Sequence, residues 1–239
     1  MFRSVLLVHG AFHTGDCWEN LAPELLQRGL NPKPITLSGH RGNSKLPSLV
    51  GMGTYGSDII AAAEAIGEPC ILLGHSLGGM AISEAAERRP DLFDRLIYLS
   101  AFVPKLGKCS LRDLPPTTAT MRSSVKPSLN GTATMPPEIA NVVFYNRCTP
   151  AIQQKATQLL CPQPVRAATD SVTATQEGLG SVSKYYIECT DDNALPIASQ
   201  REMQANMPLD SVQSIDSDHS PFLSQPAVLA ALIQHIAES

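Results

Sequence analysis

The segment Gly74–Gly79 (GHSLGG) has the residue types of a serine nucleophile on a sharp turn. It comes directly after the apolar run Cys70–Leu73 and directly before a helical pattern. Small residues on both sides of the serine suit a strained turn from strand to helix, which aims the first backbone amides of the helix at a reacting centre. The pattern predicts Ser76 as the nucleophile and the Leu77 N–H as an oxyanion donor. The alternative is a glycine-rich turn in which the serine has no chemical role.

A serine hydroxyl needs a base near neutral pH, normally a histidine that a carboxylate holds in the correct tautomer. In enzymes with this turn the chain order is nucleophile, acid, histidine. His219 follows an expected strand and lies in a loop, whereas His235 lies inside the terminal helical pattern AALIQHIAE. The sequence therefore predicts His219 as the base, with His235 as an ordinary surface or core histidine.

His219 follows the strand expected over residues 211–215. The acid is expected at the end of the strand before it, which is expected over residues 184–188. Asp191 and Asp192 both stand there, and one of the two is expected to be only a loop residue. Asp216 and Asp218 are too close to His219 along the chain to be first choices, and turn formation and solvation account for them.

A second oxyanion donor is expected after the first strand, where the chain reads His9–Phe12 (HGAF). The Ala11 N–H is the predicted donor, and Gly10 permits the close approach of the backbone. Cys17 and Cys148 are the alternative nucleophiles. Neither lies at a sharp turn or a helix start that would lower its pKa, so the serine is preferred.

The elements that must hold these residues alternate along the chain. Strands are expected over residues 3–8, 35–37, 69–73, 95–100, 184–188 and 211–215, and helices over 18–28, 54–66, 77–88, 198–207 and 226–237. This alternation predicts an α/β fold with a mostly parallel sheet covered on both faces. Pro32 and Pro34 flank the second strand and place it at an edge of the sheet. Ser224 is the expected N-cap of the last helix.

Residues 104–180 interrupt this pattern and hold nine of the 19 prolines. We expect them to form an insertion outside the sheet, a cap over its carboxyl edge, with helices over 138–143 and 149–160. Residues 1–103 and 181–239 are then the core.

Composition excludes several other classes of protein. The chain has 239 residues, of which 43% are hydrophobic and 17% charged, and a formal net charge of −4 with no run of like charges. These values exclude a disordered chain and a coiled coil, and they argue against nucleic acid as a partner. No apolar stretch reaches the 18 or more residues of a membrane span, and no signal peptide is expected.

The six cysteines are scattered without a CxxC pair or metal-like spacing. We expect reduced, mostly structural cysteines in a cytoplasmic protein and no metal site. Disulfides are the minor alternative, chiefly among Cys109, Cys148 and Cys161.

With these motifs the chain resembles the α/β-hydrolase superfamily over nearly its full length. Within it, the chain is most similar to the plant methylesterase and hydroxynitrile lyase group and its bacterial esterase relatives. The finer match is carried by His9–His13, Cys17 and Trp18, Ala101–Pro104, Tyr186–Asp192 with Gln200, and Asp218–Leu223. The resemblance implies a six-stranded sheet, a small and mostly helical cap, and Asp192 as the acid.

The chain also departs from that group. Asp16 stands where the group usually has tryptophan, Thr14 stands where it often has glycine, and residues 105–147 match poorly, so the substrate is left open. The lyase branch tends to carry threonine in place of Gly10 and lysine in place of Ser220, where the lysine stabilises departing cyanide. This chain has neither.

The first functional hypothesis is a serine hydrolase, a carboxylesterase that cleaves carboxylic esters through an acyl-enzyme. The alternatives are hydroxynitrile cleavage on the same scaffold and a slow-turnover protein that binds a ligand. The expected pocket residues are Gly10, Phe12, His13, Phe102 and Ser220. No metal or organic cofactor is implied. The expected partner is a small-molecule ester, and assembly into a homodimer is left open.

Overall fold

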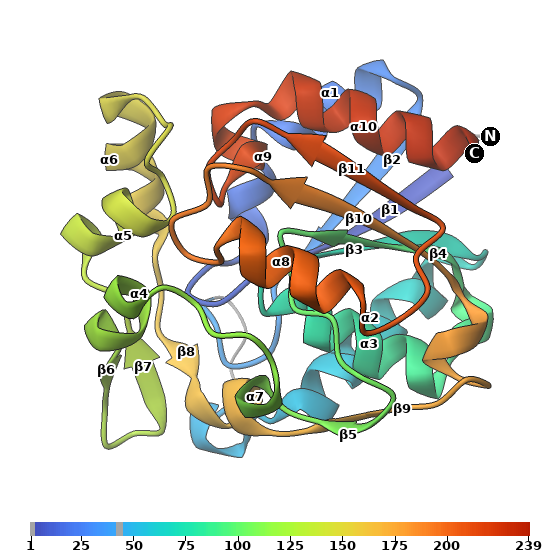
Figure 1. Ribbon diagram of the computed structural model, residues 1–239, viewed down its shortest axis with the longest axis horizontal. Helices are drawn as coiled ribbons and strands as arrows, with labels where there is room; N and C mark the ends of the chain where they lie inside the picture. The colour runs from blue at the N-terminus through green and yellow to red at the C-terminus, as the bar shows by residue number, and fades with distance from the viewer. Residues whose placement is uncertain (1–2, 42–44) are drawn as a thin grey trace.

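A computed structural model describes residues 3–41 and 45–239 (Figure 1). Its central sheet has six strands in the order β11-β10-β4-β3-β1-β2, and each neighbouring pair is parallel. The strands are β1 (Arg3–Val8), β2 (Leu30–Ile35), β3 (Cys70–His75), β4 (Phe93–Leu99), β10 (Ser183–Cys189) and β11 (Ser211–Ile215). The predicted α/β fold with a parallel six-stranded sheet is confirmed.

Helices cover both faces of this sheet. They are α1 (Leu21–Gln27), α2 (Met52–Ile66), α3 (Gly78–Arg88), α8 (Ile197–Gln204), α9 (Pro221–Ser224) and α10 (Pro226–Glu238). Helices α1 and α10 lie on one face, and α2, α3 and α8 lie on the other (Figure 1). Successive β1 side chains alternate between the two cores, because side chains of a strand point to opposite faces: Leu6 joins the core under α2 and α3, and Leu7 joins the core under α1 and α10.

Strand β2 is an edge strand, as its prolines predict, and it pairs with β1 alone among the described strands. It covers Leu30–Ile35, however, so the expected position over residues 35–37 is wrong. Pro32 and Pro34 lie within the strand rather than beside it. They are tolerated there because an edge strand has N–H positions that face away from the ladder.

The last helix begins at Pro226, and the residue before it is Gln225, so the prediction of Ser224 as its N-cap is wrong. Proline suits the first helical position because its missing N–H would have no partner there. Ser224 instead ends the short helix α9, and its hydroxyl donates to Asp218 Oδ1 at 2.7 Å.

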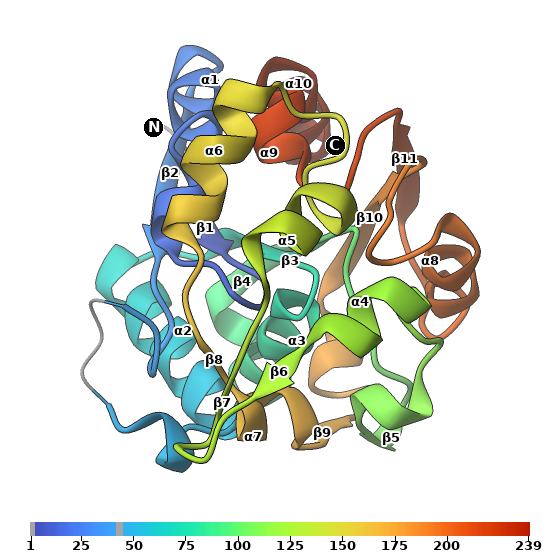
Figure 2. The ribbon, with the colours of Figure 1, turned by 90° about the vertical axis from the view of Figure 1, so that its left-hand side faces the viewer.

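Residues 104–180 lie outside the six-stranded sheet and reach over its carboxyl edge, where α4, α5 and α6 face the viewer in Figure 2. Their helices are α4 (Ala119–Ser124), α5 (Pro137–Val143), α6 (Pro150–Leu159) and α7 (Val165–Thr169), so both helices expected here are present. The division into core and cap at residues 104 and 180 remains our proposal. We call residues 104–180 the cap.

The cap also contains short strands that we did not expect. These are β5 (Gly107–Cys109) paired with β9 (Val172–Ala174), and β6 (Lys126–Pro127), β7 (Thr132–Thr134) and β8 (Gln163–Pro164) in a second small sheet. Strands of two or three residues are too short to show a period of two in the sequence, so tertiary contacts alone reveal them.

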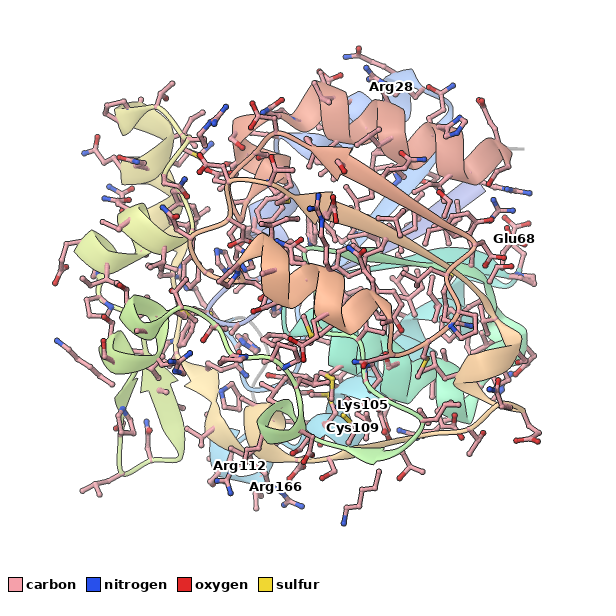
Figure 3. All side chains as sticks on the ribbon, viewed as in Figure 1. Arg28, Glu68, Lys105, Cys109, Arg112 and Arg166 are labelled. Atoms are coloured by element: carbon pink, nitrogen blue, oxygen red, sulfur yellow. The ribbon has the colours of Figure 1, made fainter. Side chains whose placement is uncertain are left out.

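The remaining regular elements are single turns of 3-10 helix. They are η1 (Gly15–Trp18), η2 (Pro47–Leu49), η3 (Pro90–Leu92), η4 (Leu111–Asp113) and η5 (Leu179–Ser181). All six cysteines are buried with free thiols. Cys109 is buried although Lys105 and Arg112 near it are exposed (Figure 3). No helix of the described chain is both long enough and apolar enough to cross a bilayer.

Close packing at the start of α3 makes Gly79 hard to replace. A Cβ on Gly79 would overlap the carbonyl oxygen of Phe102 and lie 2.9 Å from the Ala101 side chain. We expect Gly79→Ala to lower the free energy of unfolding by about 1 to 3 kcal/mol in urea denaturation, because the backbone must shift. Gly53→Ala in α2 is the matched control, since its nearest neighbour would be 3.9 Å away. Helix propensity favours alanine at both positions, so equal effects would contradict the packing argument.

Candidate active site

The turn after β3 places Ser76 in a strained backbone conformation. Its φ is 53°, in the left-handed region that non-glycine residues rarely adopt. The Ser76 N–H donates to the Leu99 carbonyl at 3.3 Å, and the Ser76 carbonyl accepts from the N–H groups of Gly79 (3.0 Å) and Phe102 (3.1 Å). Bonds to the end of β4 and to the start of α3 therefore hold the turn in this shape.

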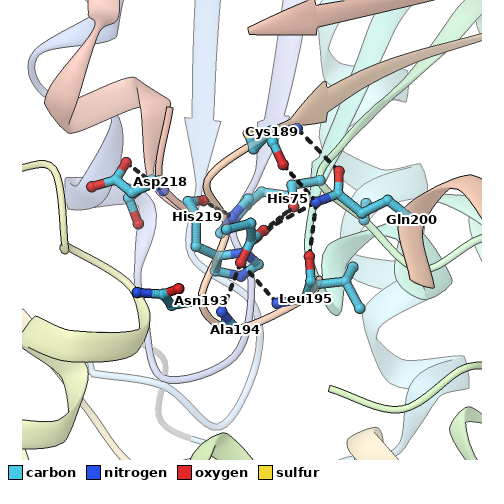
Figure 4. Close-up of polar contacts among 12 residues, drawn as sticks. His75, Cys189, Asn193, Ala194, Leu195, Gln200, Asp218 and His219 are labelled. Atoms are coloured by element: carbon cyan, nitrogen blue, oxygen red, sulfur yellow. Dashed lines mark hydrogen bonds and ion pairs between the residues drawn. The ribbon is translucent and has the colours of Figure 1, made fainter. Parts of the chain in front are cut away.

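His219 and Asp192 come together from two neighbouring loops. Asp192 follows β10 and His219 follows β11, and His219 Nδ1 lies 2.6 Å from Asp192 Oδ2 (Figure 4). Both residues are buried. Because β10 and β11 are adjacent and parallel, their carboxyl ends deliver these loops to the same edge of the sheet. His235 is exposed on α10 and lies apart from this pair.

The Asp192 carboxylate is surrounded by donors that fix its orientation. Oδ1 accepts from the backbone N–H groups of Ala194 and Leu195, both at 2.7 Å. Oδ2 faces the His219 ring and also accepts from the amide of Gln200 at 3.4 Å. A carboxylate held in this way keeps the Nδ1 proton of His219 in place, which leaves Nε2 as the acceptor.

Two residues support this carboxylate in a role that our sequence reasoning did not assign, although it named Gln200 as part of the family resemblance. Ser100, with φ 38°, donates its hydroxyl to Asp192 Oδ2 and lies 3.4 Å from His219 Nδ1. Gln200 binds the backbone of Cys189 through both ends of its amide, at 3.0 Å each, and donates to the Leu195 carbonyl at 2.8 Å (Figure 4). Nothing in the sequence around Ser100 marks it. Gln200 could have been found as a polar residue on the buried face of a helix.

The other acidic candidates point elsewhere. Asp191 pairs with Arg147 Nη1 at 3.1 Å and Asp216 pairs with Arg147 Nη2 at 3.1 Å, near the surface. Asp218 is fully buried and accepts from the Ser220 N–H and the Ser224 hydroxyl. Of these acidic residues, Asp192 is the one that the described structure places against the His219 ring, so the geometry favours it over Asp191.

The two alternative cysteine nucleophiles have environments that oppose thiolate formation. Burial is the main cause that raises the pKa of Cys17, with the nearby Asp16 as the next. Burial also raises the pKa of Cys148, and Asp218 adds to this. A nucleophilic cysteine needs the opposite shift, so these environments favour neutral, structural thiols.

The loop after β1 packs directly under Ser76. A Cβ on Gly10 would lie 2.9 Å from the Ser76 Cβ, which explains the glycine. The Gly10 carbonyl lies 2.9 Å from His9 Nδ1, and the Leu37 N–H donates to His9 Nε2 at 3.1 Å. Since a backbone N–H can only donate, Nε2 is the acceptor and Nδ1 carries the proton. His9 thus fixes the peptide whose N–H belongs to Ala11.

A cavity of about 450 Å³ opens beside Ser76 and His219. Ala11 and Leu77, the two predicted oxyanion donors, lie in its wall. The cap supplies most of the remaining wall, which is largely apolar and includes Leu111, Met121, Val125, Ala133, Val165 and Ala168. Such a lining suits an uncharged organic molecule of modest size.

Only part of the predicted pocket lines this cavity. Phe12 and Phe102 do, whereas Gly10, His13 and Ser220 are not among the residues of its wall. Gly10 is packed beneath Ser76. His13 is turned away behind its loop, with Nδ1 at 2.7 Å from the Ala11 carbonyl and Nε2 at 2.7 Å from the Tyr145 hydroxyl. Ser220 is fully buried just before α9.

Known proteins match this chain closely enough to define its family. A family model described as the alpha/beta hydrolase family matches residues 5–232. Methyl jasmonate esterase 1 from Vitis vinifera is 30% identical over 254 residues, which cover 99% of this chain and 97% of that protein. A pyrethroid hydrolase from Sphingobium wenxiniae is 31% identical over 250 residues, which cover 98% of this chain and 88% of that protein.

Solved structures agree with this result. A pyrethroid hydrolase from Sphingobium faniae has a TM-score of 0.86 at 29% identity, and the match covers 99% of this chain and 98% of that chain. The methylesterase MES16 from Arabidopsis has a TM-score of 0.84 at 25% identity, with 99% of each chain covered. The chain belongs to the alpha/beta hydrolase family. The predicted resemblance to plant methylesterases and bacterial relatives is also confirmed.

Buried neutral histidines make the stability of this site depend on pH. Burial lowers the pKa of His13 from its ordinary 6.5 to about 4, so between these values the unfolded chain binds more protons than the folded one. The free energy of unfolding should therefore fall as the pH drops from 6.5 towards 4, by about 3 kcal/mol for His13 alone. Urea denaturation across this range measures the slope. His13→Asn should reduce it. A flat profile would contradict a buried, neutral His13.

Proposed function

We propose that this protein is a serine carboxylesterase with Ser76 as nucleophile, His219 as general base and Asp192 as the acid that orients His219. The observation that carries the proposal is the 2.6 Å contact of His219 with a buried, hydrogen-bonded Asp192, at a cavity that Ser76 also lines. A base with an oriented ring beside a serine on a strained turn is what nucleophilic acyl transfer requires.

The reaction proceeds in two halves. His219 Nε2 takes the proton of the Ser76 hydroxyl as its oxygen attacks the ester carbonyl, and the N–H groups of Ala11 and Leu77 hold the tetrahedral oxyanion. The oxyanion collapses, His219 returns the proton to the departing alcohol, and an acyl-enzyme remains. Water, deprotonated by His219, then attacks the acyl-enzyme and releases the carboxylic acid and free Ser76.

The relatives support an ester as the substrate, since one is named a methyl jasmonate esterase and another a pyrethroid hydrolase. The wall of the cavity is mostly apolar, with Arg122 among its lining residues, and it supports a small organic ester. Cleavage of a hydroxynitrile would need a cation for the departing cyanide, and position 220, where the lyases tend to have lysine, holds a buried serine. Ester hydrolysis is therefore favoured over the lyase reaction.

The test of this proposal is turnover of short-chain, long-chain and aryl esters, with mandelonitrile offered beside them. Ser76→Ala or His219→Ala should lower kcat by at least about a thousandfold, as loss of a triad member does. A serine-directed phosphonate should label Ser76. Ser57→Ala, an exposed serine in α2, is the control and should keep full activity. Retention of a tenth of the rate by Ser76→Ala, or cyanide release faster than hydrolysis of every ester, would refute the proposal.

The two neighbouring acids can be separated by matched substitutions. Asp192→Asn should lower kcat on the order of 10⁴-fold, because an amide in this place favours the wrong tautomer of His219. Asp191→Asn should stay within about tenfold of the wild type, because the Asp191 carboxylate contacts Arg147 and Asn146 near the surface and not His219. Steady-state kinetics on one ester substrate measures both variants. Equal losses, or the reverse order, would move the acid to Asp191.

A further inference from the structure

Gln163, in the cap strand β8, enters the core behind the loop that carries Ala11. Its side chain is 2% exposed and makes four polar contacts. Gln163 Oε1 accepts from the Phe12 N–H at 3.4 Å and lies 3.2 Å from His40 Nε2. Its Nε2 donates to the Tyr55 hydroxyl and to the Pro164 carbonyl, both at 3.0 Å. Every donor and acceptor of this amide group therefore has a partner within the protein.

The orientation of this amide follows from two partners whose roles cannot change. The Phe12 N–H can only donate, so it must face the amide oxygen, and the Pro164 carbonyl can only accept, so it must face the amide nitrogen. His40 Nε2 lies against the same amide oxygen, and the Tyr55 hydroxyl accepts from the amide nitrogen. A buried amide with these four partners has one stable position.

The backbone that Gln163 contacts is strained. Phe12 has φ 66°, in the left-handed region, and such a conformation persists only where the surroundings hold it. The Phe12 carbonyl accepts from the Cys161 N–H at 2.9 Å, so the cap binds Phe12 through both of its backbone polar atoms. The Ala11 carbonyl, on the same peptide as the Phe12 N–H, is held by His13 Nδ1 at 2.7 Å.

This strained peptide is the direct neighbour of the proposed oxyanion donor. The Gly10–Ala11 peptide carries the Ala11 N–H, and the Ala11–Phe12 peptide is joined to it at the Ala11 Cα. A displacement of the second peptide would shift the shared Cα and, with it, the Ala11 N–H. Donors to an oxyanion must be aimed before the charge develops, because reorientation during the reaction costs free energy. The contact with Gln163 thus lies one peptide away from an atom whose direction controls the rate.

We propose that Gln163 is a positioning residue, which holds the Ala11–Phe12 peptide so that the Ala11 N–H points at the oxyanion. This inference rests on the proposed esterase function. Gln163 lines the same cavity as Ser76 and His219, but its amide groups are saturated by protein partners, so it acts through the loop and not on the substrate. The cap, by this reasoning, completes the oxyanion site as well as the cavity wall.

The decisive variant is Gln163→Met, which keeps the approximate volume and removes the acceptor for the Phe12 N–H. We expect kcat to fall about 10- to 100-fold while KM changes by less than about threefold, because the lost interaction serves the transition state. The affinity for an alkyl trifluoromethyl ketone, which forms a tetrahedral adduct with a serine, should fall by a similar factor. Rates are expressed per active site titrated with a phosphonate, so unfolded protein does not enter the comparison.

Two further variants distinguish positioning from general support of the fold. Gln163→Glu keeps an acceptor for the Phe12 N–H and should restore kcat to within about threefold of the wild type. Tyr55→Phe removes a partner from the other end of the same amide and should also keep kcat within about threefold, whatever it does to the unfolding midpoint. If Gln163→Met does not fold, Gln163→Asn, whose shorter side chain withdraws the acceptor, is judged by the same criteria.

The outcomes separate this inference from the proposed function. Wild-type protein that hydrolyses no ester and is not labelled at Ser76 would refute the function itself. An active wild type with unchanged kcat in Gln163→Met would overturn the positioning role alone. A rise in KM at constant kcat in Gln163→Met would mean that Gln163 contacts the substrate. An equal loss of kcat in Tyr55→Phe would mean that the amide supports the fold in general. Each of these two results also overturns the inference.

Discussion

The left-handed backbone of Ser76 is the constraint on which the rest of the site depends. It places the serine side chain above the sheet, and it requires the neighbouring backbone to come very close. A Cβ on Gly74 would lie 2.7 Å from the Gly78 carbonyl, and one on Gly78 would lie 2.9 Å from the carbonyls of Val8 and His9. With Gly10 beneath Ser76, these glycines let β1, β3 and α3 meet at one point. The strained backbone conformation of Ser76 persists because this close packing leaves the backbone no room to move to a more favourable conformation.

The parallel sheet brings the remaining chemical groups to that point. Strands β1, β3, β4, β10 and β11 all end at the same edge, so the loops that follow them converge there. The loop after β1 carries Ala11, the loop after β10 carries Asp192, and the loop after β11 carries His219. Ser100, directly after β4, contacts both Asp192 and His219 through its hydroxyl. Each loop is anchored by a short strand, which positions side chains better than a free loop would.

The cap forms more than a cover over the cavity. It contributes Gln163 and Cys161 to the backbone of Phe12, and Tyr145 to the ring of His13. Arg147 bridges the two loops that carry Asp192 and His219 through Asp191 and Asp216. Many of these partners are buried and polar. Their hydrogen bonds fix the positions of the groups, and the loss of one bond leaves a buried polar group without a partner. The cavity wall and the arrangement of the proposed catalytic groups therefore depend on the same part of the chain.

The amino-acid sequence by itself determined the fold class, the order of the elements and the most prominent reactive groups. The alternation of apolar runs and helical patterns was strong enough to predict the six strands and their helices, and the GHSLGG turn pointed to Ser76 as the candidate nucleophile. Local signals of this kind arise from the periodic burial of side chains and from turn geometry. Both depend on residues that are neighbours in the sequence. Errors such as the range of β2 and the cap at Ser224 concern boundaries, where the local signal is weakest.

Tertiary structure alone decided the features that join distant parts of the chain. Residue types and spacing left Asp191 and Asp192 open and only the family resemblance pointed to Asp192, whereas the direction of each side chain relative to His219 gives a physical reason to favour Asp192. The support from Ser100 and the contacts of Gln163 involve partners 92 and 151 residues away, and no local pattern encodes such distances. The cap side chains in the cavity wall were not predicted for the same reason, since they come from segments whose short strands have no detectable period. Packing over long sequence separations is a property of the whole fold, and it becomes visible only once the fold is formed.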